Sequence, residues 1–345
     1  MTESQLIIRG LKIDPPLFLA PMAGLTHSAM RTLLQKFGGV GLLSSEMLSA
    51  RRLPVENQFI SPYLIKTEQE RPLSYQLFVT KVEEVGPAID TLHRFGADAI
   101  DLNLGCPAPR VRQAGGGSSL MAEAETVKKI VAEARRLTDN PLSAKIRLGE
   151  VLDKNKLKEF CRLLEGEGID FLTVHARLRK EQFCRPPRWE WVRHVKQWLT
   201  IPVVANGSIF SVDDARSCLR ASGADGLMIG RAAAERPWIF SDIGREVFGV
   251  SIPEQEVILP EIYKHFVLAL VQRFRTERQL GRLKEFTHYF ARNYTFGHRL
   301  ASAVQSSSTV QEAIDRAHAF FTRNDEEYAA FDLGGREVEE RGRIT

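Results

Sequence analysis

Asp101-Leu102-Asn103-Leu104-Gly105-Cys106-Pro107-Ala108 is an alternating apolar run that stops at Asn, Gly, Cys and Pro. Residues 99–103 are predicted to form a short buried strand, and Gly105 and Pro107 force a loop after it. Cys106 therefore follows the C-terminal end of a strand, where barrel enzymes carry their catalytic groups. Taken alone, such a cysteine could be a nucleophile, a metal ligand, an acid or a small apolar core residue.

Length and composition favour one barrel-sized domain plus a smaller one, because 345 residues with 43% hydrophobic content can bury a large core. Residues 1–14 lack the apolar core of a signal peptide, and no apolar run reaches membrane-spanning length. We expect a cytoplasmic monomer without membrane contact. The four cysteines are too widely spaced to predict a metal site or a disulfide framework.

Eight strand-like runs alternate with amphipathic helical segments. The predicted strands are residues 17–20, 40–46, 74–78, 99–103, 143–147, 171–175, 202–206 and 226–230, and the clearest helices are 28–37, 122–137, 157–167 and 212–221. Eight such pairs favour an α/β fold of the (β/α)₈ TIM-barrel type over an open doubly wound sheet. A capping box at Ser211-Val212-Asp213-Asp214 and helix stops at Gly38 and Gly223 support the predicted helix boundaries.

The pattern changes after Phe248. We predict a barrel domain over residues 1–248, a smaller all-helical domain over 254–331 with helices at 261–279, 283–297 and 310–321, and a flexible tail over 332–345. The whole chain has a net charge of only +4, but the segment 273–299 is strongly basic. Its seven cations are Arg273, Arg275, Arg278, Arg282, Lys284, Arg292 and Arg299. They indicate either a solvated helix face or a surface for nucleic acid.

Polar or glycine-rich groups follow seven of the eight predicted strands. They are Pro21-Met22-Ala23-Gly24, Gln76, Asn103 with Cys106, Lys145, His175, Asn206-Gly207-Ser208 and Gly230-Arg231. The last two groups occupy the usual phosphate site of this barrel, although two ordinary glycine turns would look the same. Lys145 on an apolar strand requires an anion or an electron-rich ring beside it, which a flavin would supply. His175 could equally be a hydrogen-bonded core residue.

The chain resembles the tRNA-dihydrouridine synthase family of the bacterial type. The matching elements are Ala20-Pro21-Met22-Ala23-Gly24, Tyr75-Gln76-Leu77, Asp101 to Ala108 as quoted above, Lys145-Ile146-Arg147, His175, Asn206-Gly207 and Met228-Ile229-Gly230-Arg231-Ala232-Ala233. They follow in order from about residue 17 to Phe240. The Asn-x-Gly-Cys-Pro-Ala element is specific, whereas the Gly-Arg pair is not.

The resemblance implies a flavin mononucleotide (FMN) barrel and a helical RNA-binding domain, with NADPH as reductant. The residues expected to bind FMN are Pro21, Met22, Ala23, Gln76, Lys145, His175, Asn206, Gly207, Ser208, Gly230 and Arg231. Cys106 is expected to protonate C5 of a uracil ring while reduced FMN gives a hydride to C6, which yields 5,6-dihydrouridine. Asn103, Arg177 and Arg292 are expected to contact the substrate. The loop 109–119, with three consecutive glycines, is predicted to be flexible enough to close over the base.

The substrate is expected to be folded tRNA, from which a uridine must be flipped out. A ribosomal RNA target is an alternative, because the loop from His175 onward departs from the family pattern. Ala176 stands where Gly is usual, and Phe183-Cys184-Arg185-Pro186-Pro187 replaces a small turn. A second alternative is a flavin barrel acting on a free pyrimidine, like dihydroorotate or dihydropyrimidine dehydrogenase. A third is a non-catalytic RNA-binding module.

Overall fold

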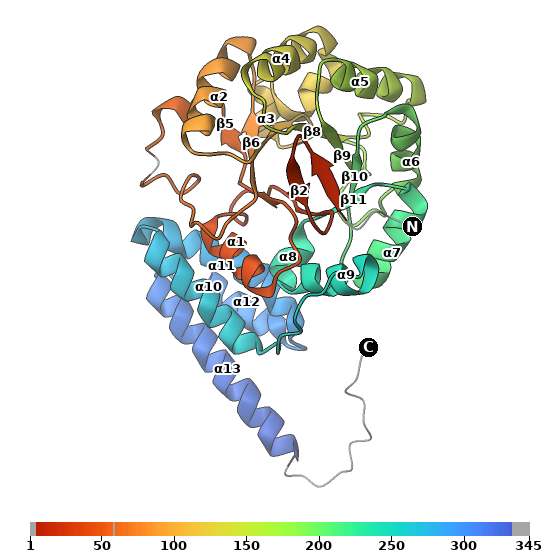
Figure 1. Cartoon of the computed structure of the whole chain (residues 1–345). Coiled ribbons are helices and arrows are strands. Elements are labelled where there is room, and N and C mark those ends of the chain that lie inside the picture. The colour runs from red at the N-terminus through yellow and green to blue at the C-terminus, as the bar shows by residue number, and fades with distance from the viewer. Residues whose placement is uncertain (1–4, 58, 333–345) are drawn as a thin grey trace.

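Eight parallel strands form the barrel in the computed structural model, which describes residues 5–57 and 59–332, with side chains through Arg323. The barrel strands are β3 (Leu17–Leu19), β4 (Leu43–Ser44), β6 (Leu73–Phe78), β7 (Ala99–Asn103), β8 (Leu142–Arg147), β9 (Phe171–His175), β10 (Val203–Asn206) and β11 (Gly226–Ile229). Their order is β3-β11-β10-β9-β8-β7-β6-β4, and a parallel bridge between Phe18 and Leu42 joins the two ends (Figure 1). The predicted TIM-barrel class is confirmed.

The second barrel strand is shorter than the predicted run of residues 40–46. It divides into β4 and β5 (Leu48–Ser49), both of which pair with β6. Between them the Ser45 hydroxyl, rather than a backbone carbonyl, accepts the hydrogen bond from the Gln76 N–H at 3.1 Å. This side-chain substitution interrupts the ladder and allows residues 45–47 to leave the strand path.

Helices cover the outside of the barrel as the sequence predicts. They are α1 (Ser28–Phe37), α2 (Val85–Arg94), α4 (Ala124–Leu137), α5 (Lys154–Gly166), α6 (Trp189–Trp198), α7 (Val212–Ser222), α8 (Arg231–Glu235) and α9 (Ile239–Phe248). The predicted boundaries of α7 are confirmed, since the Ser211 hydroxyl accepts from the Asp214 N–H at 3.0 Å and Gly223 ends the helix with φ +62°.

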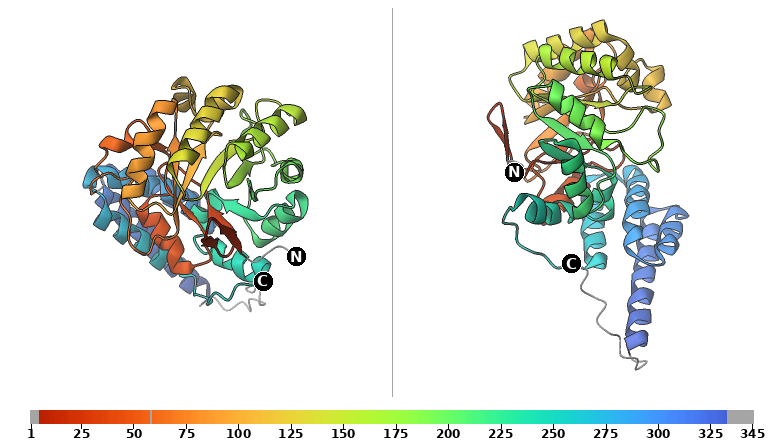
Figure 2. Two further views of the ribbon diagram at one scale, coloured as in Figure 1. Left: turned by 45° about the horizontal axis from the view of Figure 1, so that its top comes forward. Right: turned by 90° about the vertical axis from the view of Figure 1, so that its right-hand side faces the viewer.

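A hairpin that the sequence analysis missed closes the N-terminal end of the barrel. Its strands, β1 (Leu6–Ile8) and β2 (Leu11–Ile13), pair antiparallel around Arg9 and Gly10. Leu6, Ile8 and Ile13 pack against the barrel interior, in one cluster with Phe18, Phe171, Val204 and Met228. The hairpin crosses the barrel opening in Figure 1 and stands at one end of the barrel in Figure 2. Functional groups are therefore restricted to the other end.

The C-terminal region is helical, but its boundaries differ from those predicted. It comprises α10 (Leu259–Arg273), α11 (Gln279–Phe290), α12 (Gly297–Gln305) and α13 (Val310–Asp332), the last of which extends away from the barrel (Figure 1). The helix predicted over 261–279 stops early, because the Gln279 amide donates to the carbonyls of Val271 at 3.2 Å and Phe274 at 2.6 Å and so caps α10. Residues 333–345 of the predicted tail lie outside the described residues.

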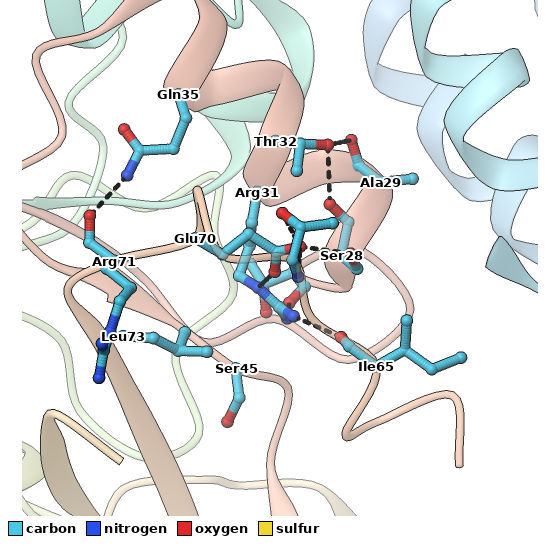
Figure 3. A network of polar contacts seen from close by, with 12 residues as sticks. Ser28, Ala29, Arg31, Thr32, Gln35, Ser45, Ile65, Glu70, Arg71 and Leu73 are labelled. Carbon is cyan, nitrogen blue, oxygen red and sulfur yellow. Dashed lines mark hydrogen bonds and ion pairs between the residues drawn. The ribbon is translucent and has the colours of Figure 1, made fainter. Parts of the chain in front are cut away.

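A buried ionic network fixes this helical region to the barrel (Figure 3). Arg31 on α1 donates to Glu70 at 2.6 Å, to the Thr26 carbonyl at 2.6 Å and to the Ile65 carbonyl at 2.9 Å. Ser28 also donates to Glu70. Arg273 of α10 reaches the Ser28 carbonyl at 3.0 Å and lies 4.0 Å from Glu70. The helical region is thus bonded to the barrel through a fully buried carboxylate.

Candidate active site

A pocket of about 230 Å³ opens at the C-terminal ends of the strands. The predicted residues that line it are Pro21, Met22, Ala23, Lys145, His175, Arg177, Asn206, Gly207, Ser208, Gly230 and Arg231. Gln76, Asn103, Cys106 and Arg292 do not line it. Phe183, Phe210, Glu285 and Tyr289 line it without having been predicted, and the last two belong to α11. One wall of the pocket therefore comes from the helical region.

Parallel register places the polar strand ends beside one another. Asn103 is paired with Lys145, and His175 is paired with Asn206. Lys145 Nζ donates to Asn206 Oδ1 at 3.0 Å, while Asn206 Nδ2 donates to the Met228 carbonyl at 2.8 Å. Asn206 thus holds Lys145 over the barrel with a neutral partner, and the ammonium keeps donors for a further ligand.

The loop after β10 approaches its neighbours too closely for a side chain at Gly207. Its φ is +127°, and a Cβ there would lie 3.1 Å from the His175 ring and 3.3 Å from Arg177 Nη1. Trp189 Nε1 donates to the Gly207 carbonyl at 3.0 Å and fixes this conformation. The loop leaves backbone and a small hydroxyl, that of Ser208, facing the pocket.

Positive charge gathers around the pocket without matching carboxylates. The pKa of Lys145 is lowered to about 8, mainly because the ammonium is buried. The nearby Arg147 lowers it further. Burial and the nearby cations Lys145, Arg147, Arg177 and Arg231 also lower the pKa of His175 well below its usual value, so its ring is neutral at pH 7. Glu285 is the single carboxylate among the described lining residues. Such a site favours an anionic ligand.

Two phenyl rings orient Arg231. Its guanidinium carbon lies 4.4 Å from the ring centroid of Phe183 and 5.3 Å from that of Phe210. Phe183 also stacks on His175 at 6.0 Å between centroids. These cation–π contacts hold the arginine without neutralising its charge.

Gln76 and Asn103 belong to a hydrogen-bonded chain beside the pocket. Ser143 and Gln76 donate to the Asp101 carboxylate at 2.6 and 2.7 Å, and Asn103 Nδ2 donates to Gln76 Oε1 at 2.7 Å. Asn103 Oδ1 then accepts from the Cys106 N–H at 3.0 Å. The chain connects the barrel interior to the loop that carries the cysteine.

Cys106 is partly exposed and faces the same cations as the pocket. Cys106 acts on the pKa values of both Lys145 and Arg147, which requires the sulfur to lie near them. Gly105 packs against the end of β8, where a Cβ would lie 3.1 Å from the Lys145 carbonyl oxygen. The thiol is thus held beside the strand end rather than buried in hydrocarbon.

The loop after Cys106 contains two short helical segments. Residues 109–113 form the short helix α3 (Pro109–Gln113), and a 3₁₀ turn covers Gly117–Ala122. A Cβ on Gly116 would lie 2.0 Å from the Phe78 ring, and one on Gly117 would lie 2.7 Å from the Cys106 carbonyl. These two glycines therefore permit close packing, and closure of the loop over a base stays a prediction.

Arg177 and Arg292 occupy different environments. Arg177 is 1% exposed, and it donates to the Phe183 carbonyl at 3.1 Å and to the Ser208 hydroxyl at 2.7 Å, so it braces the loop after β9. Arg292 is exposed, 3.5 Å from a Glu235 carboxylate oxygen and 5.4 Å from the Tyr289 ring centroid. Substrate contact by either residue stays a prediction, and Arg292 has the more accessible guanidinium.

Glu46 links the helical region to the pocket, and sequence reasoning missed it. Its carboxylate accepts from the Gly24 N–H at 2.5 Å and lies 3.6 Å from Arg282 on α11. Burial raises the pKa of Glu46, and the Gly24 N–H and Arg282 oppose that shift. A buried carboxylate thus fixes the Pro21–Gly24 loop from one side and α11 from the other. Arg147 was not predicted as a site residue either, although it belongs to the Lys145-Ile146-Arg147 element quoted for the family resemblance.

Two classes of feature are absent from residues 5–57 and 59–332. No cluster of three or more histidine, cysteine or acidic side chains is arranged to hold a metal ion. None of the helices combines the length and the apolar character needed to cross a bilayer.

Solved structures with a similar fold include histamine dehydrogenase from Rhizobium sp. 4-9, with a TM-score of 0.53 and 12% identity over 72% of this chain and 48% of that one. The old yellow enzyme homologue from Zymomonas mobilis matches with a TM-score of 0.51 and 12% identity, over 77% of this chain and 96% of that one. At such identities the likeness concerns the barrel fold alone.

Curated relatives are more informative. A probable tRNA-dihydrouridine synthase 1 from Synechocystis sp. is 29% identical over 89% of this chain and 87% of the relative. The tRNA-dihydrouridine(16) synthase of Neisseria meningitidis is 32% identical over 86% of this chain and 92% of the relative. For tRNA-dihydrouridine synthase B of Escherichia coli, the identity is 37% over 66% of this chain and 70% of the relative. The family model described as dihydrouridine synthase matches residues 18–325. This chain therefore belongs to the dihydrouridine synthase family.

Proposed function

We propose that this protein reduces a uridine in folded tRNA to 5,6-dihydrouridine, with FMN as cofactor and NADPH as reductant. The observation that carries the proposal is the cluster of unpaired cations at the strand ends, with the Cys106 thiol beside it. Reduction of a uracil ring requires a hydride donor and a proton donor, and a flavin bound through its anionic phosphate would supply the hydride.

The pocket residues suit FMN on three grounds. The backbone at Gly207 is open to a close ligand, because no side chain fits there. Ser208 and Arg231 offer a hydroxyl and a guanidinium to a phosphate, and Lys145 offers a buried ammonium to an electron-rich ring edge. Pro21, Met22 and Ala23 supply an apolar wall. The remaining predicted contacts are His175, Asn206 and Gly230, which line the pocket, and Gln76, which does not.

Cys106 is the proposed general acid. When bound and reduced by NADPH, FMN supplies the hydride that goes to C6 of uracil. Cys106 would then give its proton to C5. The Cys106 N–H donates a hydrogen bond to Asn103 Oδ1 at 3.0 Å, which fixes the loop that presents the thiol.

The RNA partner is proposed from the relatives' names and from the charge of the helical region. Of its basic segment, Arg273 and Arg282 are used inside the protein, whereas Arg275, Arg278, Arg292 and Arg299 are exposed. Exposed cations beside the catalytic end would serve a polyanion and would have no purpose with a free pyrimidine. A ribosomal RNA target is the second candidate. The assignment of residues 254–331 to RNA binding, the monomeric state and the cytoplasmic location are part of the same proposal.

The decisive experiment maps dihydrouridine in the RNA of cells with and without this gene. Loss of dihydrouridine at one or more tRNA positions, restored by the wild-type gene, is the expected result. Loss confined to ribosomal RNA would transfer the proposal to that substrate. Unchanged dihydrouridine in both RNA classes, together with purified protein that does not bind FMN, would reject it.

A further inference from the structure

A second cavity, of about 380 Å³, lies in the helical region between α12 and α13. Phe296, Arg299, Arg316, Phe320 and Arg323 line it together with two alanines. Its volume falls within the roughly 300–1,000 Å³ that small-molecule sites occupy. None of these side chains belongs to the pocket at the strand ends.

The lining combines cations with aromatic faces. Arg299 lies 4.8 Å above the ring centroid of Phe296, which is 46% exposed. Arg316 is held in place by Glu312 at 2.6 Å and by the Ala303 carbonyl at 3.0 Å. No acidic residue is among the described side chains that line the cavity. An exposed ring flanked by guanidinium groups is a stacking platform for a nucleobase, with cations available to its phosphates.

This cavity continues a series that starts at the catalytic pocket. Tyr289 lines that pocket, Arg292 lies 5.4 Å from the Tyr289 ring centroid, and Phe296 follows four residues later. The intervening 3₁₀ turn (Ala291–Asn293) is bound to α8, because Asn293 Nδ2 donates to the Glu235 carbonyl at 2.6 Å. Arg231 of the pocket begins α8. Two aromatic–arginine pairs thus follow one another along the chain from the pocket.

We propose that the cavity between α12 and α13 binds an unpaired nucleotide of the RNA substrate, with its base stacked on Phe296 and its phosphates at Arg299 and Arg323. The proposal rests on the RNA substrate of the proposed function. It adds a second point of attachment, which would orient the RNA while a uridine enters the catalytic pocket.

The test measures the affinity of FMN-loaded full-length protein for a tRNA transcript that lacks modifications. Phe296→Ala is expected to weaken binding roughly 5- to 150-fold, the range that one lost base stack implies. Phe296→Trp keeps a stacking face and is expected to bind like the wild type. Arg299→Glu is expected to weaken binding and to reduce by about one the slope of log affinity against log salt.

Arg220→Glu is the matched control, because Arg220 is an exposed arginine on α7 of the barrel. This variant is expected to keep most of the wild-type affinity for the transcript. The proposal is overturned if Phe296→Ala and Arg299→Glu bind the transcript as Arg220→Glu does. It is also overturned if these variants instead abolish self-association of the protein while RNA affinity is unchanged. Dihydrouridine formation by the wild type is assayed on the same transcript: RNA binding that depends on Phe296 without any uridine reduction would reject the proposed function and keep this site.

Discussion

The junction between α1 and α10 and the pocket at the strand ends both bury cations, but only the junction supplies carboxylates for them. At the junction, Arg31 and Arg273 lie 2.6 and 4.0 Å from Glu70. In the pocket, Lys145 and Arg177 bond to an amide, a hydroxyl and carbonyls, and Arg231 contacts two rings. Among the described residues, none of these three pocket cations forms an ion pair.

The difference distinguishes a structural cluster from a binding cluster. Buried charges are costly unless they are paired, so the junction's network is self-contained and serves the fold. The pocket's charges lack such a partner, and the phosphate of the proposed FMN would supply one, so that part of the burial cost would be recovered as affinity. Substitutions in the two clusters should therefore affect different measurements.

The largest effect is expected at the catalytic end, without a loss of stability. Cys106→Ala should slow uridine reduction by roughly 10²–10⁴-fold, the usual contribution of a general acid. Reduction of bound FMN by NADPH should persist, because it does not use the thiol. Rapid-mixing absorbance and dihydrouridine yield measure the two steps separately.

Cys184→Ala is the matched control, since this cysteine is exposed in the loop after β9. It should reduce uridine at a rate close to the wild type. Equal rates for Cys106→Ala and Cys184→Ala would remove Cys106 from the mechanism.

The junction should respond in the opposite way. Glu70→Gln leaves Arg31 buried without its carboxylate and should lower the free energy of unfolding by about 3–5 kcal/mol. Urea titration followed by circular dichroism measures this loss. Glu133→Gln removes the exposed ion-pair partner of Arg136 and should change the urea midpoint of unfolding far less than Glu70→Gln does. Similar midpoints for the two variants would show that the network is not the anchor of the helical region.

Removal of a pocket cation should cost affinity rather than stability. Arg231→Met is expected to weaken FMN binding roughly 10- to 150-fold, which corresponds to a charged hydrogen bond of about 1.5–3 kcal/mol. The FMN-free protein should be at least as stable as the wild type, because the charge repulsion between Arg231 and Arg177 is relieved. Quenching of FMN fluorescence measures the affinity, and Arg231→Lys should recover part of it. A destabilised FMN-free variant with normal affinity would make Arg231 a structural residue.

The smallest effect concerns pH. Because the pKa of Lys145 is lowered to about 8 before FMN binds, the side chain loses its proton as the pH rises above that value. An anionic ligand favours the protonated form, so FMN affinity should fall by up to about tenfold per pH unit above pH 8. Lys145→Met should bind more weakly and show no such decline between about pH 7.5 and 9.5. A wild-type profile that is flat over the same range would place FMN away from Lys145.

Most of the barrel could be predicted because its signals are local. Strands β9 and β10 end in His175 and Asn206 after apolar runs, and Lys145 lies near the end of β8. Parallel strands bring such ends to one edge, so the strand pattern was enough to place these three residues together. The hairpin β1–β2 was missed because three-residue strands carry too little periodicity.

The remaining site residues could not be predicted, because their roles depend on distant parts of the chain. Glu46 acquires its function from Arg282 of α11, and nothing near either residue indicates the other. Phe183 lies in a loop whose course is set by Arg177 bonding to its carbonyl. Glycines 116 and 117 show the same difficulty, since close packing and flexibility both favour glycine.

Helix α11 contributes Glu285 and Tyr289 to the pocket and Arg282 to the support of the Pro21–Gly24 loop. Hybrid enzymes made by exchanging C-terminal regions between relatives would consequently carry over part of the cofactor's environment as well. Retention of the cofactor and choice of RNA would be inherited together, and a successful hybrid must match α11 to its barrel before any new specificity can emerge.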